Sequence, residues 1–387
     1  MNFEPSRAKA LDKLNNFVEN NLSEYSKLRN FDFGPENRSN VSCLSPYITH
    51  GIINEKEVIN KSLSKFSFSK NEKFIQEVLW RTYWKGWLEL RPNVWSDYLT
   101  ELNKIREDFK NNQNYINAVE GKTNIECFNV WVNELKQNNY LHNHTRMWFA
   151  SIWIFTLKLP WQLGAKFFYE NLFDGDAASN TLSWRWVAGL QTRGKNYLAK
   201  SWNIQKFTNN RLSAKNLNES ALPLDEFTEY KLEENMTNFS KSNKSTDLII
   251  FENDLFLRDR MKLFESYKNI YLVLLNNKLR KLPISLKVYD FKKSLCEDFC
   301  SQISNCQIIE NIENQKFDEL EECDVIYPFV GENLDFIKEF SKKKYLKINY
   351  IERKEDNYCK QFSKKGFFNF KNNIVKIIDH LGLNINK

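Results

Sequence analysis

The sequence has 387 residues, which is long enough for two domains with ordinary hydrophobic cores. It holds 56 Lys and Arg against 49 Asp and Glu, and residues 146–220 carry most of the excess with 10 basic and 4 acidic residues. Its longest apolar stretch, residues 147–161, is too short to cross a bilayer and is interrupted by Lys158, so a membrane protein is excluded. The basic region suits a phosphate-bearing partner, although the charge alone is equally typical of a solvated surface.

The cysteines and the first residues indicate the compartment. Seven cysteines, an odd number without Cys-x-x-Cys spacing, predict reduced and packed thiols rather than a disulfide framework. Residues 1–17 lack the apolar core of a signal peptide. We therefore expect a cytoplasmic protein.

Residues 1–212 have the pattern of an all-α domain. Apolar residues recur at three- and four-residue intervals in segments 6–28, 54–64, 71–90, 126–139, 143–158 and 161–173. All 11 tryptophans lie between Trp80 and Trp202. A polar stretch follows, and we interpret residues 213–245 as a linker.

Residues 246–387 alternate short apolar runs with helical stretches. The expected strands are 248–251, 270–275, 286–289, 307–309, 325–327 and 346–351. The expected helices are 259–267, 292–303, 334–341 and 372–381. This alternation predicts an α/β domain with a parallel sheet, and it contains no G-x-G-x-x-G or P-loop sequence.

Residues 40–51 read NVSCLSPYITHG and place hydroxyl groups directly before an expected helix. Hydroxyls and unpaired backbone N–H groups at a helix N-terminus suit an anionic diphosphate. The alternative is an ordinary helix N-cap before Pro46.

Residues 77–84 read EVLWRTYW, so Glu77, Trp80, Arg81 and Trp84 can share one helical face. A carboxylate beside an aromatic platform suits a flipped pyrimidine pair, which needs both stacking and hydrogen bonding. An aromatic-rich core helix is the alternative, and the spacing alone favours it.

Two further segments combine amide, guanidinium and carboxylate groups. Residues 141–147 read LHNHTRM, and residues 172–186 read LFDGDAASNTLSWRW. Acidic residues flanking a glycine also occur in calcium loops, but the further ligands of that pattern are absent, and no metal site is expected. The histidines of the first segment are equally typical of surface or capping residues.

These segments, with GKT at 121–123, resemble the flavin-binding domain of the DNA photolyase/cryptochrome family in order and in approximate spacing. They are similar to the family patterns T-S-x-L-S-P-Y-L-x-x-G, N-E-L-x-W-R-E-F-Y, G-x-T-G-x-P…W-M-H-N-R-x-R-M and D-G-D-x-A-x-N-x-x-x-W-x-W. The chain departs from them at Val41, Asn124, Glu126 and Asn129. The resemblance covers roughly residues 5–212.

The resemblance implies FAD as the cofactor. The residues implied to bind it are Tyr25, Ser42, Leu44, Ser45, Asn143, Arg146, Asp174, Asp176 and Asn180. Asp174 would pair with Arg146, and Asn180 would face the flavin N5 atom. No antenna chromophore can be inferred.

The resemblance also implies DNA containing ultraviolet lesions as the partner. The residues implied to contact it are Glu77, Trp80, Arg81, His144, Met147, Trp186, Arg193 and Lys195. Lys200, Lys206 and Arg211 are further candidates for phosphate contacts. Asn143 and Met147 favour cyclobutane dimers over (6-4) photoproducts.

The implied catalytic residues are Glu77, Asn143, Trp184 and Trp161, with Trp184 and Trp161 as the inner and middle members of an electron-transfer row. The outer position falls on Phe109, which cannot serve. Tyr115, Trp95 or Trp153 could replace it.

We therefore predict a monomeric photolyase that repairs cyclobutane pyrimidine dimers with light-excited reduced FAD. A cryptochrome-like photoreceptor without repair activity is the alternative, supported by Phe109, His144 and the order of the domains. A flavin-free nucleic-acid-binding protein would require the cofactor site to have decayed. Residues 248–259 faintly resemble the segment with which photolyases usually begin, so the second domain is interpreted as a permuted antenna-type domain.

Overall fold

The computed structural model describes residues 3–233, 237, 239–240, 244–311 and 315–385. Contacts divide the chain into two compact units whose segments alternate along the sequence. The helical unit contains Glu24–Cys43 and Asn93–Lys231. The sheet unit contains Phe3–Ser23, Leu44–Pro92 and Leu232–Lys387.

The helical unit is built around buried tryptophans. Its elements are α2 (Leu22–Leu28, which begins just before the unit), α6 (Asn93–Phe109), α7 (Gln113–Glu120), α8 (Glu126–Asn138), α9 (Asn143–Ser151), η1 (Ile152–Thr156), α10 (Trp161–Asn171), α11 (Ala177–Ala188) and α12 (Ser201–Phe207). Gly164 in α10 lies so close to Trp184 in α11 that an added Cβ atom would be 2.3 Å from the indole. Only glycine therefore permits this approach of the two helices.

The sheet unit contains six parallel strands in the order β1-β6-β5-β2-β3-β4. They are β1 (Phe239–Ser240), β2 (Asp247–Phe251), β3 (Asn269–Val273), β4 (Cys306–Ile309), β5 (Glu322–Ile326) and β6 (Lys347–Ile351). The chain proceeds from β2 outward to β4 and then returns to the other side of β2, as in doubly wound folds.

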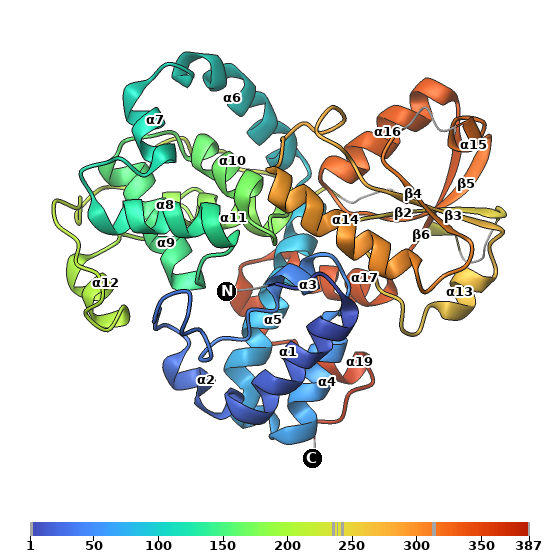
Figure 1. Cartoon of the computed structure of the whole chain (residues 1–387), viewed down its shortest axis with the longest axis horizontal. Helices are drawn as coiled ribbons and strands as arrows, with labels where there is room; N and C mark the ends of the chain where they lie inside the picture. The colour runs from blue at the N-terminus through green and yellow to red at the C-terminus, as the bar shows by residue number, and fades with distance from the viewer. Residues whose placement is uncertain (1–2, 234–236, 238, 241–243, 312–314, 386–387) are drawn as a thin grey trace. The chain divides into compact units, whose positions relative to one another are not determined.

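Helices follow the strands of this sheet, as Figure 1 shows. They are α13 (Met261–Glu265), α14 (Leu286–Cys300), α15 (Gln315–Asp318), α16 (Glu332–Lys344), α17 (Lys354–Lys360), η2 (Gln361–Lys364), α18 (Phe367–Lys371) and α19 (Ile374–His380). One core joins alternate strand residues such as Ile249 and Phe251 to Phe317 of α15 and Ile337 of α16. Both faces of β2 are buried, which explains its continuous apolar run.

The predicted fold class is confirmed: residues 3–212 form helices, and a parallel sheet follows. The strand expected at 286–289 is wrong, because these residues begin α14. Ser285 caps that helix by accepting a hydrogen bond from the Val288 amide, and Val288, Phe291 and Leu295 are buried at helical spacing. The expected linker contains the short strand β1, which pairs with β6.

The first helices of the chain pack with the sheet rather than with the other helices. These are α1 (Arg7–Asn20), α3 (Ser45–Thr49), α4 (Glu55–Lys65) and α5 (Phe68–Glu89). Buried Glu89 at the end of α5 accepts hydrogen bonds from the Tyr327 hydroxyl and the Val330 amide after β5. The compact units therefore differ from the division expected at residues 212 and 246.

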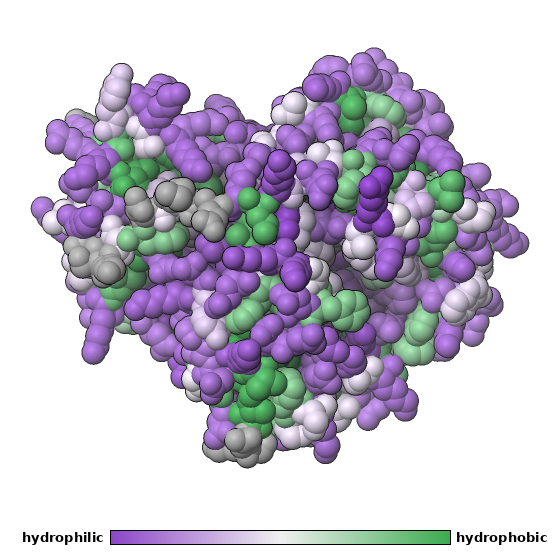
Figure 2. Space-filling view, turned by 180° about the vertical axis from the view of Figure 1, so that it is seen from behind, coloured by the Kyte–Doolittle hydropathy of each residue, from purple (hydrophilic) through white to green (hydrophobic). Residues whose placement is uncertain are grey.

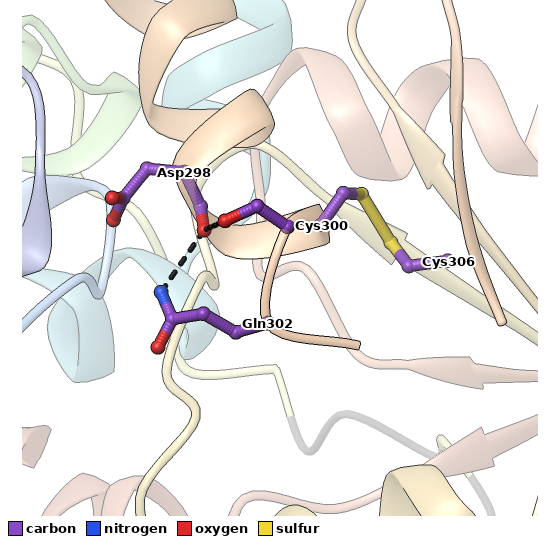
Figure 3. Close-up of a disulfide and its surroundings, with 5 residues drawn as sticks. Asp298, Cys300, Gln302 and Cys306 are labelled. Atoms are coloured by element: carbon purple, nitrogen blue, oxygen red, sulfur yellow. Dashed lines mark hydrogen bonds between the residues drawn. A yellow bond between two sulfur atoms is a disulfide. The ribbon is translucent and has the colours of Figure 1, made fainter. Parts of the chain in front are cut away.

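A disulfide joins Cys300, the last residue of α14, to Cys306, the first residue of β4 (Figure 3). The two Cα atoms are 5.3 Å apart. The turn between them is held by Gln302, whose side-chain amide donates to the Asp298 carbonyl at 2.9 Å. This pair departs from the expectation of reduced thiols, whereas the five other cysteines, all among the described residues, are buried and form no disulfide.

Hydrophilic side chains cover most of the face shown in Figure 2, and hydrophobic residues form separate patches between them. Among the residues that the structure describes, no helix combines the length and hydropathy needed to cross a membrane.

Candidate functional site: the predicted flavin and lesion residues

Arg146 and Asp174 form a partly buried ion pair in the helical unit. The Arg146 Nη2 atom donates to Asp174 Oδ2 at 2.9 Å, and its Nε atom donates to the Leu141 carbonyl. Burial lowers the pKa of Arg146, but the charge of Asp174 raises it overall. The pair therefore stays ionised and offers a fixed cationic group beside a buried carboxylate.

Two polar residues lie at the start of α11. Asp176 caps the helix by accepting hydrogen bonds from the Ala178 and Ser179 amides at 2.9 and 2.8 Å. Asn180 is buried, and its amide nitrogen donates to the Ala165 carbonyl at 2.8 Å. This orientation leaves the Asn180 Oδ1 oxygen as the acceptor for a ligand.

The first two turns of α9 carry three predicted site residues that differ in environment. Asn143 is exposed and Met147 is half-buried. The His144 ring lies 2.9 Å from the Asn30 carbonyl and 3.2 Å from the Tyr197 hydroxyl, and it stacks on Trp148. Burial lowers the pKa of His144, so this residue is neutral at physiological pH and is held by internal contacts.

The buried tryptophans form two aromatic rows. In the first, the Trp184 ring lies 6.2 Å from Trp153, which lies 6.0 Å from half-buried Tyr115. Trp153 belongs to η1, a single turn of π-helix.

In the second row, Trp161 stacks on Tyr98 at 5.5 Å, and Tyr98 lies 5.7 Å from Trp95. This row ends on a buried ring, because Trp95 is 2% exposed. Of the two rows, the one through Trp153 is thus the one that ends on a partly exposed ring.

A buried ionic cluster in the helical unit was not predicted. The guanidinium of Arg38 lies 3.4 Å from Asp32 and contacts Glu134, and it also lies over the Tyr140 ring. Arg146 lies over the same ring at 5.2 Å. Burial raises the pKa of Glu134 to about 7, despite Arg38. These residues are far apart in sequence, and a sequence pattern carries no signal for such a cluster.

The predicted diphosphate segment spans the boundary between the two units. Tyr25 and Ser42 belong to the helical unit, whereas Leu44 and Ser45 belong to the sheet unit. Ser45 begins the short helix α3, and Leu44 at its N-cap position makes no side-chain capping bond. The diphosphate role and the alternative of an ordinary helix N-terminus before Pro46 both stay predictions.

In the sheet unit, α5 carries Glu77, Trp80 and Arg81, which are all half-buried, and the buried Trp84. The Trp80 and Trp84 rings lie 5.2 Å apart. Trp80 stacks on Phe367 of α18, with ring centroids 3.5 Å apart and an angle of 11° between the planes. The predicted stacking platform for the substrate therefore already holds an aromatic ring of the same chain.

The remaining predicted DNA contacts lie near the end of α11 and in the segment after it. Trp186 is half-buried and stacks on Tyr197, with ring centroids 5.8 Å apart. Arg193 and Lys195 are exposed, and the Arg193 guanidinium lies over Phe227. Their exposure leaves both cations accessible to a phosphate.

The donor set of the helical unit fits reduced FAD. Arg146 offers a guanidinium to an anionic group, and the Asn180 oxygen can accept a hydrogen bond from a protonated ring nitrogen. Trp184 is buried and packs against Gly164.

Comparison with known proteins agrees with this chemistry. Residues 74–215 match the family model of the FAD-binding domain of DNA photolyase. The chain is 32% identical over 192 residues to the deoxyribodipyrimidine photo-lyase of Agrobacterium fabrum, a match covering 48% of this chain and 38% of that protein. It is 26% identical over 200 residues to that of Vibrio cholerae, covering 50% and 41%. The chain thus matches about two fifths of the length of these relatives.

Two solved structures are also similar. A class III photolyase from Agrobacterium tumefaciens has 28% identity and a TM-score of 0.44, over 53% of this chain and 43% of that one. A cryptochrome from Synechocystis has 22% identity and a TM-score of 0.47, over 54% and 44%.

Proposed function

We propose that this chain, whose residues 74–215 match the FAD-binding domain of DNA photolyase, works as a member of the photolyase/cryptochrome family and repairs cyclobutane pyrimidine dimers in DNA. When bound, reduced FAD supplies the light-excited electron that splits the dimer. The observation that supports this proposal is the Arg146–Asp174 ion pair in the helical unit, together with an Asn180 amide of the same unit whose oxygen is oriented as an acceptor. Together they would bind and orient the flavin.

The α5 face would hold the lesion. The Glu77 carboxylate would accept hydrogen bonds from the pyrimidine N–H groups, and Trp80 would stack on one ring. Phe367 supports the second role, because a flat ring already lies nearly parallel to the Trp80 indole. A pyrimidine would compete with Phe367 for that face.

The resemblance also implies lesion contacts on α9, which belongs to the helical unit. The exposed amide of Asn143 would hydrogen-bond the substrate, and Met147 would pack against it. Arg193 and Lys195, both exposed, would bind the phosphates on either side.

The decisive experiment measures repair of a thymine-dimer oligonucleotide by the purified, reduced protein under blue light, with a dark control. We expect light-dependent return of intact thymines. Glu77→Ala should keep bound flavin and lose repair, whereas Glu72→Ala, a carboxylate on the same helix, should keep both. Bound FAD without repair in the wild type would contradict the proposal and favour a cryptochrome-like photoreceptor.

The monomeric state and the cytoplasmic location stay predictions, which light scattering and cell fractionation would test.

A further inference from the structure

Trp202 on α12 differs from every other tryptophan of the chain. All 11 tryptophans lie among the described residues, and Trp202 alone belongs to the exposed class, with 57% of its surface accessible. Its neighbours Ile204 and Thr208 are fully buried, so they anchor the opposite side of the helix. A large flat ring is thus fixed at the surface on a short, well-anchored helix, without a core contact that requires its size.

The exposed side of α12 is basic. Trp202 and Lys206 are spaced at i and i+4 on α12, and both are exposed, so they form a short stripe on one side of the helix, and exposed Asn209 follows in the turn after it. Residues 195–215 contain five basic residues and no acidic one. Glu219 reaches the start of the helix, but its carboxylate accepts hydrogen bonds from the Ser201 amide and hydroxyl. The charge beside Trp202 therefore favours an anionic ligand.

A surface pocket of about 280 Å³ lies at the far end of this stripe. It is lined by Phe33, Asn37, Thr208, Asn209 and Arg211. An aromatic ring, two amides and a guanidinium are the groups that stack on a base, hydrogen-bond its edge and contact its phosphate. The pocket thus combines an aromatic ring with a cation, as Trp202 and Lys206 do on α12.

The pocket is held in place by a row of rings and backbone bonds. Phe33 stacks on Phe31 at 5.5 Å, and Phe31 packs edge-on against Phe207 at the end of α12. The Asp32 amide donates to the Phe207 carbonyl at 2.7 Å. Gly34, with a φ of 93°, lets the Arg211 side chain lie across it. These contacts fix the pocket relative to Trp202.

We propose that this α12 surface, made of Trp202, Lys206 and the Phe33 pocket, binds unpaired nucleotides of single-stranded DNA. One base stacks on Trp202, Lys206 neutralises a phosphate, and a neighbouring base enters the pocket beside Arg211. The surface requires neither a lesion nor the flavin, so it goes beyond the proposed repair activity.

Fluorescence anisotropy with a labelled, undamaged oligothymidylate in the dark tests this inference. We expect the protein to bind the single strand more tightly than a duplex of equal length. Trp202→Ala should weaken binding about ten-fold, whereas Trp202→Phe should retain most of it, because stacking on an aromatic ring contributes on that scale. Arg211→Gln should also weaken binding.

Lys104→Ala is the matched control for Lys206→Ala. Lys104 is an exposed cation on α6, and Figure 1 places α6 and α12 at opposite ends of the helical unit. Only Lys206→Ala should reduce affinity and lower the dependence on salt. Unchanged binding by a folded Trp202→Ala protein, or equal losses in both lysine variants, would overturn the inference. Equal binding of polyglutamate would do so as well, since it would indicate attraction to any polyanion. A protein that fails to repair dimers can still give the expected result, so the two proposals fail separately.

Discussion

The Arg146–Asp174 pair and the Trp80–Phe367 stack show how differently two sets of predicted residues are placed. Arg146 and Asp174 are 28 residues apart, and each meets the partner that the family resemblance implies. Trp80 was expected to present its face to a substrate, but it meets a phenylalanine 287 residues further along the chain. The sequence motifs thus predicted a polar pair between neighbouring motifs. They did not predict that a helix distant in sequence packs on the face of Trp80.

Of the substitutions at these two sets of residues, Asp174→Ala should have the largest effect, which is on flavin binding. It leaves the Arg146 guanidinium without its carboxylate partner. Removing one partner of a buried ion pair lowers the free energy of unfolding by about 3–5 kcal/mol. We expect the affinity for FAD to fall more than about 100-fold. The purified variant should then show a much lower flavin-to-protein ratio, measured by absorbance. Asp108→Ala, an exposed carboxylate of the same unit, is the control. Normal flavin content in Asp174→Ala would remove the ion pair from the cofactor site.

Substitutions of Trp80 and Phe367 should have opposite effects. Trp80→Ala should weaken binding of dimer-containing DNA about ten-fold, because a stacking platform is lost. Phe367→Ala should strengthen that binding about five-fold, because it removes a competing ring. Phe368→Ala is the control, because the Phe368 side chain is next to Phe367 in the sequence and is 82% exposed. Weaker binding by Phe367→Ala would mean that the stack is structural.

The two aromatic rows make different predictions for photoreduction. Trp153→Phe should slow light-driven flavin reduction severalfold or more, because Trp153 links Trp184 to the partly exposed Tyr115. Trp95→Phe should leave the rate nearly unchanged, since Trp95 ends a row inside the core. Transient absorption would separate these variants. The reverse order of rates would assign the route to Trp161 and Tyr98.

The smallest expected effect concerns Glu134. Burial raises the pKa of this carboxyl to about 7, so the folded state binds a proton that the unfolded state releases between pH 4.5 and 7. Stability should therefore fall as pH rises through this window, by about 3 kcal/mol at most. Glu134→Gln should flatten the dependence in urea titrations. An unchanged slope would locate the pH dependence elsewhere.

Periodicity was sufficient for most of the fold but not for contacts between distant segments. The buried spacing of α5 and α10 identifies them as helices, and the β-branched runs identify β2 and β3. The start of α14 was misread because Val288 and Tyr289 favour strands locally, while the Ser285 cap and the buried positions of the longer segment determine a helix. The roles proposed for Ser42 and Ser45 stay predictions, since the two residues belong to different compact units.

The interleaved segments of the sheet unit have a consequence for synthesis on the ribosome. Arg7 donates its amide hydrogen to Asp298, and the Tyr83 hydroxyl donates to the Lys365 carbonyl, so the earliest helices bind partners that are translated last. At the usual pace of translation, about 5–20 residues per second, α1, α4 and α5 wait many seconds for the sheet that covers them. The nascent chain exposes apolar helix faces throughout that interval, and we expect it to depend on chaperones more than a protein whose domains are completed in order.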